Sequence, residues 1–172
     1  MKICVIPARG GSKRIPRKNI RLFCGEPMIS WSIKAAISSN IFDKIIVSTD
    51  DKEISKISQK YGAEIPFLRP KSLSDDFTGT IPVIKHTINW VNKHIKKVEY
   101  VCCLYATAPF VEPSYLIEGY EKLINNDVNY TFSVTSFPFP IQRAIKISKL
   151  NRVEMLNPEN FNKRSQDLEE TF

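Results

Sequence analysis

The sequence has no apolar run of the roughly 20 residues needed to cross a membrane. Its first apolar stretch, residues 2–6, is also too short for the core of a signal peptide, and charged residues follow it from Arg9 onward. We therefore expect no targeting segment and no membrane-spanning segment, and we predict a cytoplasmic protein.

Cysteine and histidine are scarce. The cysteines at positions 4, 24, 102 and 103 form no pair with the spacing of metal ligands, and Cys102 and Cys103 lie inside an apolar run. We interpret the four cysteines as reduced thiols of the core. His86 and His94 are the only histidines, eight residues apart on one expected helix, and we interpret them as structural or solvent-facing.

Nothing in the composition argues for disorder, since 42% of the 172 residues are hydrophobic and 25% are charged. We expect a single domain over residues 1–172. The net charge of +7 would suit a nucleic acid, but the cations crowd one loop, and no helix carries a basic stripe with interleaved aromatics. A small phosphorylated ligand is therefore favoured over a nucleic acid.

Carboxylates are absent from the segment between Arg9 and Arg21, which we call the cation loop. This loop directly follows an apolar strand and begins with Gly10 and Gly11, which allow positive φ and a close approach of backbone N–H groups. Its spacing matches neither a Walker A loop nor a dinucleotide-binding fingerprint. A solvated basic turn is the alternative, but the strand, glycines and prolines together favour a phosphate cradle. Its cations are Arg9, Lys13, Arg14, Arg17, Lys18 and Arg21.

Strand and helix patterns alternate along the chain, which predicts an α/β fold with a mostly parallel sheet flanked by helices. In such sheets, ligands bind beyond the carboxyl ends of the strands. The loops that begin at Ala8, Thr49, Ala106 and Phe137 should therefore gather around the ligand. The expected strands are residues 2–6, 44–48, 100–105 (fully buried) and 130–136, and the expected helices are residues 27–39, 50–61, 81–95 and 113–125.

Several motifs resemble the CMP-sialic acid synthetases, which are cytidylyltransferases with a Rossmann-like nucleotidyltransferase fold. The resemblance spans nearly the whole chain and is carried by residues 6–19, 47–50 and 68–70, with Asp75, Asp76 and Thr80. Segments 66–70, 107–110, 135–144 and 164–170 are more narrowly similar to the pseudaminic acid cytidylyltransferase branch.

This resemblance implies an enzyme that transfers CMP from CTP to the anomeric hydroxyl of a nine-carbon keto-sugar acid and releases pyrophosphate. It also implies Mg²⁺ as cofactor and a homodimer, with residues 130–162 as a dimerisation or substrate subregion. Relatives continue past the position of Phe172 into a segment that helps hold Mg²⁺. The chain would therefore lack that segment, and its metal ligands are left unassigned.

The resemblance also implies the roles of single residues. Lys18 is the first choice for a catalytic cation, with Arg9 and Lys13 beside it. Tyr105 lies where many sialic acid relatives have a glutamine near the sugar, which favours pseudaminic acid. The nucleotide-binding set is Arg9, Gly10, Gly11, Ser12, Lys13, Asn19, Arg69 and Thr80, and the sugar-binding set is Tyr105, Gln142, Arg143, Arg164 and Gln166.

Several of these residues have a structural alternative. Asp50 and Glu53 have the spacing of a capping box, which favours Asp50 as a helix N-cap over a metal ligand. Asp75 and Asp76 are interpreted as caps or as free side chains. Arg69 could belong to a surface loop.

The segment that holds Gln142 and Arg143 could serve packing or dimerisation instead of binding the sugar. Two other functions also remain open for the chain. One is a related CMP-sugar synthetase that acts on legionaminic, N-acetylneuraminic or 3-deoxy-manno-octulosonic acid, and the other is a truncated, non-catalytic nucleotide-binding domain.

Overall fold

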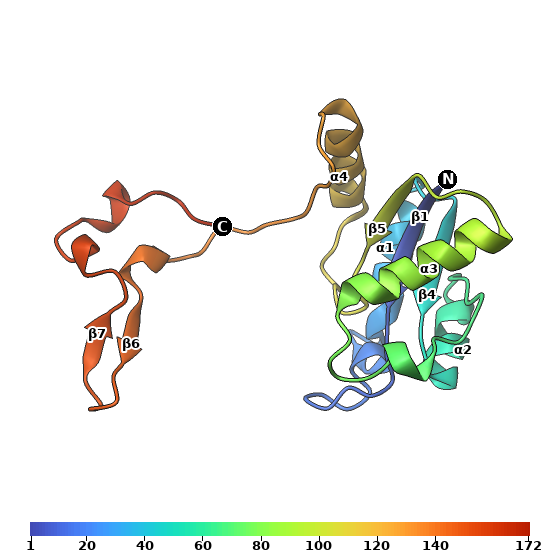
Figure 1. Cartoon of the computed structure of the whole chain (residues 1–172), viewed down its shortest axis with the longest axis horizontal. Helices are drawn as coiled ribbons and strands as arrows, with labels where there is room; N and C mark the ends of the chain where they lie inside the picture. The colour runs from blue at the N-terminus through green and yellow to red at the C-terminus, as the bar shows by residue number, and fades with distance from the viewer. The chain divides into compact units, whose positions relative to one another are not determined.

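The computed structural model describes all 172 residues, which form two compact units, Met1–Asn129 and Tyr130–Phe172 (Figure 1). The boundary lies where the expected dimerisation or substrate subregion begins. No helix in the structure is both long and apolar enough to span a bilayer.

The first unit is built on a three-stranded parallel sheet in the order β4-β1-β5. Strand β1 is central, with Ile3 opposite Lys44 on one side and Cys4 opposite Cys102 on the other. The elements of this unit are β1 (Lys2–Pro7), η1 (Lys18–Ile20), β2 (Leu22–Phe23), β3 (Glu26–Pro27), α1 (Met28–Ser38), β4 (Lys44–Ser48), α2 (Lys52–Lys60), η2 (Lys71–Leu73), α3 (Thr80–His94), β5 (Tyr100–Cys103) and α4 (Pro113–Asn125).

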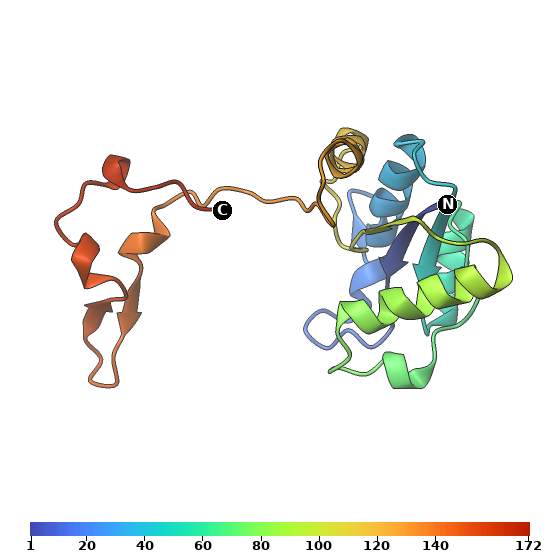
Figure 2. The same ribbon diagram turned by 45° about the horizontal axis from the view of Figure 1, so that its top comes forward.

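Side chains of β1 alternate between two apolar layers, as the pleat of a strand requires. Cys4 and Ile6 pack with α1 and α2, whereas Ile3 and Val5 pack against Val91 of α3. Figures 1 and 2 show α3 on one side of the sheet and α1 on the other. With both faces covered, β1 is a continuous apolar run, which is typical of a central parallel strand.

A short hairpin joins the cation loop to α1. Strands β2 and β3 pair antiparallel across a two-residue turn, Cys24-Gly25. Both turn residues have positive φ, 49° for Cys24 and 82° for Gly25. This is the backbone that two-residue hairpins favour, and glycine adopts it without steric cost.

The second unit contains the antiparallel pair β6 (Ile145–Ile147) and β7 (Val153–Met155). Its short 3₁₀ helices are η3 (Ile141–Arg143), η4 (Pro158–Asn160) and η5 (Ser165–Asp167). The backbone N–H of Phe137 donates to the carbonyl of Thr171 at 3.0 Å, which places the last residues of the chain beside residue 137.

Two expectations about strands are wrong. Tyr100, Val101 and Cys103 of β5 are exposed, because β5 is an edge strand paired only with β1 and the following helix α4 has no buried residue. Residues 130–136 alternate in polarity but are in no strand. Alternation shows that two faces differ, but it does not supply the neighbouring strand that pairing requires.

The interpretation of the cysteines holds only in part. All four thiols are free, and only Cys4 is buried. Cys24 is exposed in the hairpin turn, and Cys103 is exposed because it lies on the edge strand. The other expected helices and strands are confirmed to within a few residues.

Candidate functional site

A cavity of about 430 Å³ lies between the loop after β1 and the loop after β5, at the carboxyl ends of these two strands. This location is where open parallel sheets place their ligands. Its wall carries cationic side chains and no carboxylate. Its lining residues are Pro7, Arg9, Ser12, Lys13, Arg14, Ile15, Lys18, Asn19, Tyr105, Ala106 and Thr107.

Gly10 is required for a close approach and not for positive φ. Neither Gly10 nor Gly11 is among the residues with positive φ, which corrects the expectation for both. A Cβ on Gly10 would lie 2.7 Å from Oδ2 of Asp51, whereas a Cβ on Gly11 would have open space around it. The N–H of Gly10 donates to Oδ1 of Asp50 at 3.0 Å. The start of the cation loop is therefore held directly against the loop after β4.

The residue with positive φ in this loop is Arg17, at φ 55° and ψ 28°. Its guanidinium donates to both carboxylate oxygens of Asp51, at 2.5 and 3.1 Å, and to Glu53 at 2.5 Å. These bonds, with those from the N–H groups of Ile54 and Glu53, lower the pKa of Asp51 to about 2, with Arg17 as the largest cause.

The N-cap of α2 is Asp51, not Asp50 as the capping-box spacing suggested. Oδ1 of Asp51 accepts from the N–H groups of Glu53 and Ile54, both at 2.9 Å. Asp50 instead lies between Gly10 and Arg69, whose Nη2 is 3.8 Å from its Oδ1. Adjacent carboxylates thus have different tasks, and a one-residue ambiguity in the helix start hid this difference.

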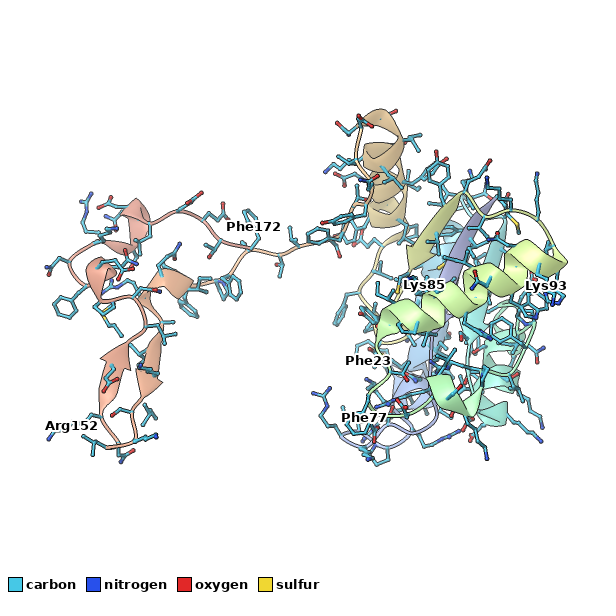
Figure 3. The ribbon with its side chains drawn as sticks, in the orientation of Figure 1. Phe23, Phe77, Lys85, Lys93, Arg152 and Phe172 are labelled. Carbon is cyan, nitrogen blue, oxygen red and sulfur yellow. The ribbon has the colours of Figure 1, made fainter.

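Asp76 is paired with two of the predicted triphosphate ligands. Its carboxylate lies 3.0 Å from Nη2 of Arg9 and also contacts Nζ of Lys13, and these cations lower its pKa, Lys13 most. Arg9 also donates to the backbone carbonyl of Asp75. Figure 3 shows Phe77, the next residue, beside the loop that follows β1. A carboxylate therefore occupies the two cations that the resemblance assigns to phosphate.

Asp75 and Asp76 do not cap α3, whose N-cap residue is Gly79. Asp75 instead holds a local turn, because its Oδ1 accepts from the N–H groups of Phe77 and Thr78 at 2.9 and 2.6 Å. The interpretation of these two aspartates as caps of the following helix is wrong.

The remaining nucleotide candidates lie in different surroundings. Lys18, Ser12 and Tyr105 line the cavity, and the buried Asn19 donates its side-chain N–H to the carbonyl of Arg9 at 2.9 Å. Thr80 is the first residue of α3 and does not line the cavity.

Arg69 does not line the cavity either, and it is not a surface residue, because its side chain is only 4% exposed. Its Nε and Nη2 have no hydrogen-bond partner, and burial lowers its pKa, although Asp50 opposes that shift. A buried guanidinium with free donors fits a group that receives an anion or a polar ring.

The other sugar candidates lie in the second unit. Arg143 donates to Oγ of Ser165 at 3.3 Å, and Nε2 of Gln142 donates to the carbonyl of Glu169 at 2.8 Å. Arg164 forms a two-bond pair with Asp167 at 2.8 and 2.9 Å, which raises the pKa of Arg164. The bonds of Arg143 and Gln142 join the two signature segments of this unit, residues 135–144 and 164–170, to each other. Gln166 lies in η5 between Arg164 and Asp167.

The described residues do not form a magnesium site on their own. No three His, Cys, Asp or Glu side chains converge on a point that could hold a metal ion. The aspartates near the cavity are engaged by protein donors: Asp50 by Gly10, Asp51 by Arg17, and Asp76 by Arg9 and Lys13.

Sequence reasoning did not single out Asp51, which caps α2 and binds Arg17, and it gave Arg14, Arg17 and Thr107 no individual role. Arg14 and Arg17 were visible only as members of a run of cations. Their separation in the structure, with Arg14 at the cavity and Arg17 paired with Asp51, follows from the turn of the loop. Thr107 lies just after the expected strand at residues 100–105. This position at the carboxyl edge of the sheet could have marked it as a residue of the site.

Comparison with known proteins agrees with this geometry. The cytidylyltransferase family profile matches residues 3–166. A pseudaminic acid cytidylyltransferase from Campylobacter jejuni is 46% identical over 170 residues, which are 99% of this chain and 73% of that protein. N-acylneuraminate cytidylyltransferase A of Danio rerio is 36% identical over 130 residues, 76% of this chain and 29% of that protein.

Among solved structures, a CMP:2-keto-3-deoxy-manno-octonic acid synthetase complexed with CTP superposes with a TM-score of 0.59 at 23% identity, over 73% of this chain and 48% of that one. A cytidylyltransferase from Leptospira borgpetersenii superposes with a TM-score of 0.56 at 17% identity, over 73% and 50% of the two chains. These similarities confirm the nucleotidyltransferase fold. With the profile match and the sequence identity, they establish that this chain belongs to the cytidylyltransferase family.

Proposed function

We propose that this chain transfers CMP from CTP to the anomeric hydroxyl of a nonulosonic acid, with pseudaminic acid as the acceptor, and releases pyrophosphate. The observation that carries the proposal is the cation-lined cavity at the carboxyl edge of the sheet, in a chain 46% identical to a pseudaminic acid cytidylyltransferase. Tyr105 at the cavity wall supports the choice of acceptor.

In this reaction the anomeric oxygen attacks the α-phosphorus of CTP and forms a new P–O bond. The bond from the α-phosphorus to the bridging oxygen breaks, and pyrophosphate leaves with the electron pair, while the hydroxyl proton passes to solvent. Negative charge grows on the phosphoryl oxygens and on the leaving group, so that fixed cations stabilise the transition state.

We assign Lys18 to the α-phosphate and Arg9 and Lys13 to the triphosphate, with Ser12 as a hydroxyl donor. The triphosphate must replace Asp76 on Arg9 and Lys13, so that the carboxylate marks the place of an anion. The buried, unpartnered donors of Arg69 are offered to the nucleotide. Gln142, Arg143, Arg164 and Gln166 remain proposed contacts of the sugar acid.

A homodimer, a cytoplasmic location and Mg²⁺ as cofactor remain predictions. Exposed apolar side chains within residues 130–162 favour association between copies of the chain. They include Tyr130, Phe132, Val134, Phe139, Ile147, Leu150, Val153 and Phe161.

The first test is pyrophosphate release with CTP and Mg²⁺, run in parallel with pseudaminic, legionaminic and N-acetylneuraminic acids. We expect release with pseudaminic acid. Preference for another acid would correct the acceptor, and release with none of the three would refute the proposed activity for this chain.

Lys18→Ala tests the assignment of the catalytic cation. We expect kcat to fall by about 10²- to 10³-fold, because one charge that stabilises the transition state is lost. Thermal unfolding should change little, since Lys18 lies in a loop and fills no core position. Lys56→Ala, which removes an exposed cation from α2, is the matched control and should retain full turnover. Unchanged turnover in Lys18→Ala would exclude the assignment.

A further inference from the structure

The cation loop is anchored at two points to the loop after β4. At its start, the N–H of Gly10 donates to Asp50, and near its end, the guanidinium of Arg17 binds Asp51 and Glu53. Between these anchors lies the part of the loop that lines the cavity with Ser12, Lys13, Arg14 and Ile15. The second anchor directly precedes Lys18.

The backbone of Arg17 is in the left-handed region, where a residue with a Cβ rarely lies unless its surroundings hold it. Its carbonyl accepts from the N–H groups of Ile20 and Arg21, both at 3.0 Å, and thereby starts the 3₁₀ turn that carries Lys18 and Asn19. The direction of Lys18 therefore depends on the conformation of Arg17.

We propose that Asp51, through its ion pair with Arg17, is a positioning residue that fixes Lys18 at the cavity. The two-bond guanidinium–carboxylate geometry sets the orientation of Arg17, because a planar fork matches a carboxylate in one arrangement. Asp51 is itself fixed by capping α2. The start of α2 therefore holds Lys18 in place through Asp51 and Arg17. This inference rests on the proposed role of Lys18.

Two substitutions break the ion pair with opposite changes of charge. Asp51→Asn keeps an oxygen that can cap α2 but loses the negative charge. Arg17→Asn removes the positive charge and keeps a residue that tolerates left-handed backbone. We expect both to lower kcat about tenfold, because misplacing a catalytic group reduces turnover, with a smaller change in KM for CTP. If the two variants change kcat in opposite directions, the effect is long-range electrostatics and the proposal is wrong.

Adding each substitution to Lys18→Ala separates positioning from a general structural effect. If Asp51 acts through Lys18, Asp51→Asn should cause no further loss of kcat in that background. An equal loss in both backgrounds would overturn the proposal.

Hydrogen exchange of the ligand-free chain provides a readout that does not require turnover. In Asp51→Asn we expect the amides of Ile20 and Arg21 to exchange at least about threefold faster, with the amides of α2 unchanged. Unchanged exchange at these two amides would overturn the proposal, whether or not the chain releases pyrophosphate. Absence of pyrophosphate release would by itself refute only the proposed function.

Discussion

At the scale of single residues, the neighbouring glycines of the cation loop have different surroundings. A side chain at position 10 would meet the carboxylate that caps α2, whereas position 11 faces open space. A side chain can be accommodated where space exists, but in a packed contact it forces its neighbours to move.

We therefore predict that Gly10→Ala lowers the free energy of unfolding by about 1 to 3 kcal/mol, as overpacking does. Gly11→Ala, the matched control, should change it by less than about 0.5 kcal/mol. Urea unfolding of both variants at neutral pH measures the difference. Equal stabilities would show that Asp51 moves aside at no cost.

The pairing of Asp76 with Arg9 and Lys13 predicts competition with the nucleotide. In Asp76→Asn, Arg9 and Lys13 no longer have an intramolecular anion as partner. We expect the KM for CTP to fall by about two- to fivefold, a small change because exposed ion pairs are weak. Steady-state kinetics would reveal this change, and Asp127→Asn, at an exposed position, is the control. A higher KM would mean that Asp76 assists CTP binding.

At the scale of elements, the start of α2 makes the stability depend on pH. The native pKa of Asp51, about 2, lies below its ordinary value of 3.8. The charged carboxylate therefore stabilises the fold fully above pH 3.8, and this contribution is lost as the pH falls through 2.

We predict that Asp51→Asn is less stable than the parent chain at pH 5 and that the difference shrinks between pH 4 and pH 2. Asp51→Ala should lower the free energy of unfolding by about 1 kcal/mol more than Asp51→Asn does, because it also removes the cap of α2. Urea unfolding across this pH range measures both effects. A difference that stays constant from pH 5 to pH 2 would contradict the prediction.

The elements that sequence reasoning predicted well are those whose pattern is set locally. Strand β4 and helix α4 begin and end where expected, because an unbroken β-branched run and a proline at the first helical turn are local signals. The exposure of β5 and the unpaired state of residues 130–136 depend on neighbours far along the chain. No local pattern contains that information.

The same distinction applies to the site. The cation loop and the strand-end loops were predictable, because residue type and topology determine them. The choice of Asp51 over Asp50 as the cap was not, since both satisfy the preference for aspartate and only the folded backbone decides. The roles of Arg17 and Asp76 also required the structure, because their partners lie 34 or more residues away in the chain.

At the scale of the whole molecule, the exposed aromatic residues of the second unit predict self-association. We expect a homodimer by sedimentation velocity, and Phe132→Ser should weaken it about tenfold if this side chain is central to the contact. Phe77→Ser, at a position 95% exposed in the first unit, is the control and should leave the association unchanged. A stable monomer at assay concentration would contradict the prediction.

The close approach of Gly10 to Asp51 also limits the order in which these two positions can change during evolution. A larger residue at position 10 is harmful while aspartate occupies position 51, but it becomes tolerable once position 51 holds a smaller side chain. If position 51 changes first, the intermediate loses the cap of α2 but has space at position 10. If position 10 changes first, the intermediate carries the steric contact with Asp51. The effect of one substitution thus depends on which came first, and the physical origin of that historical dependence is a single contact between two loops.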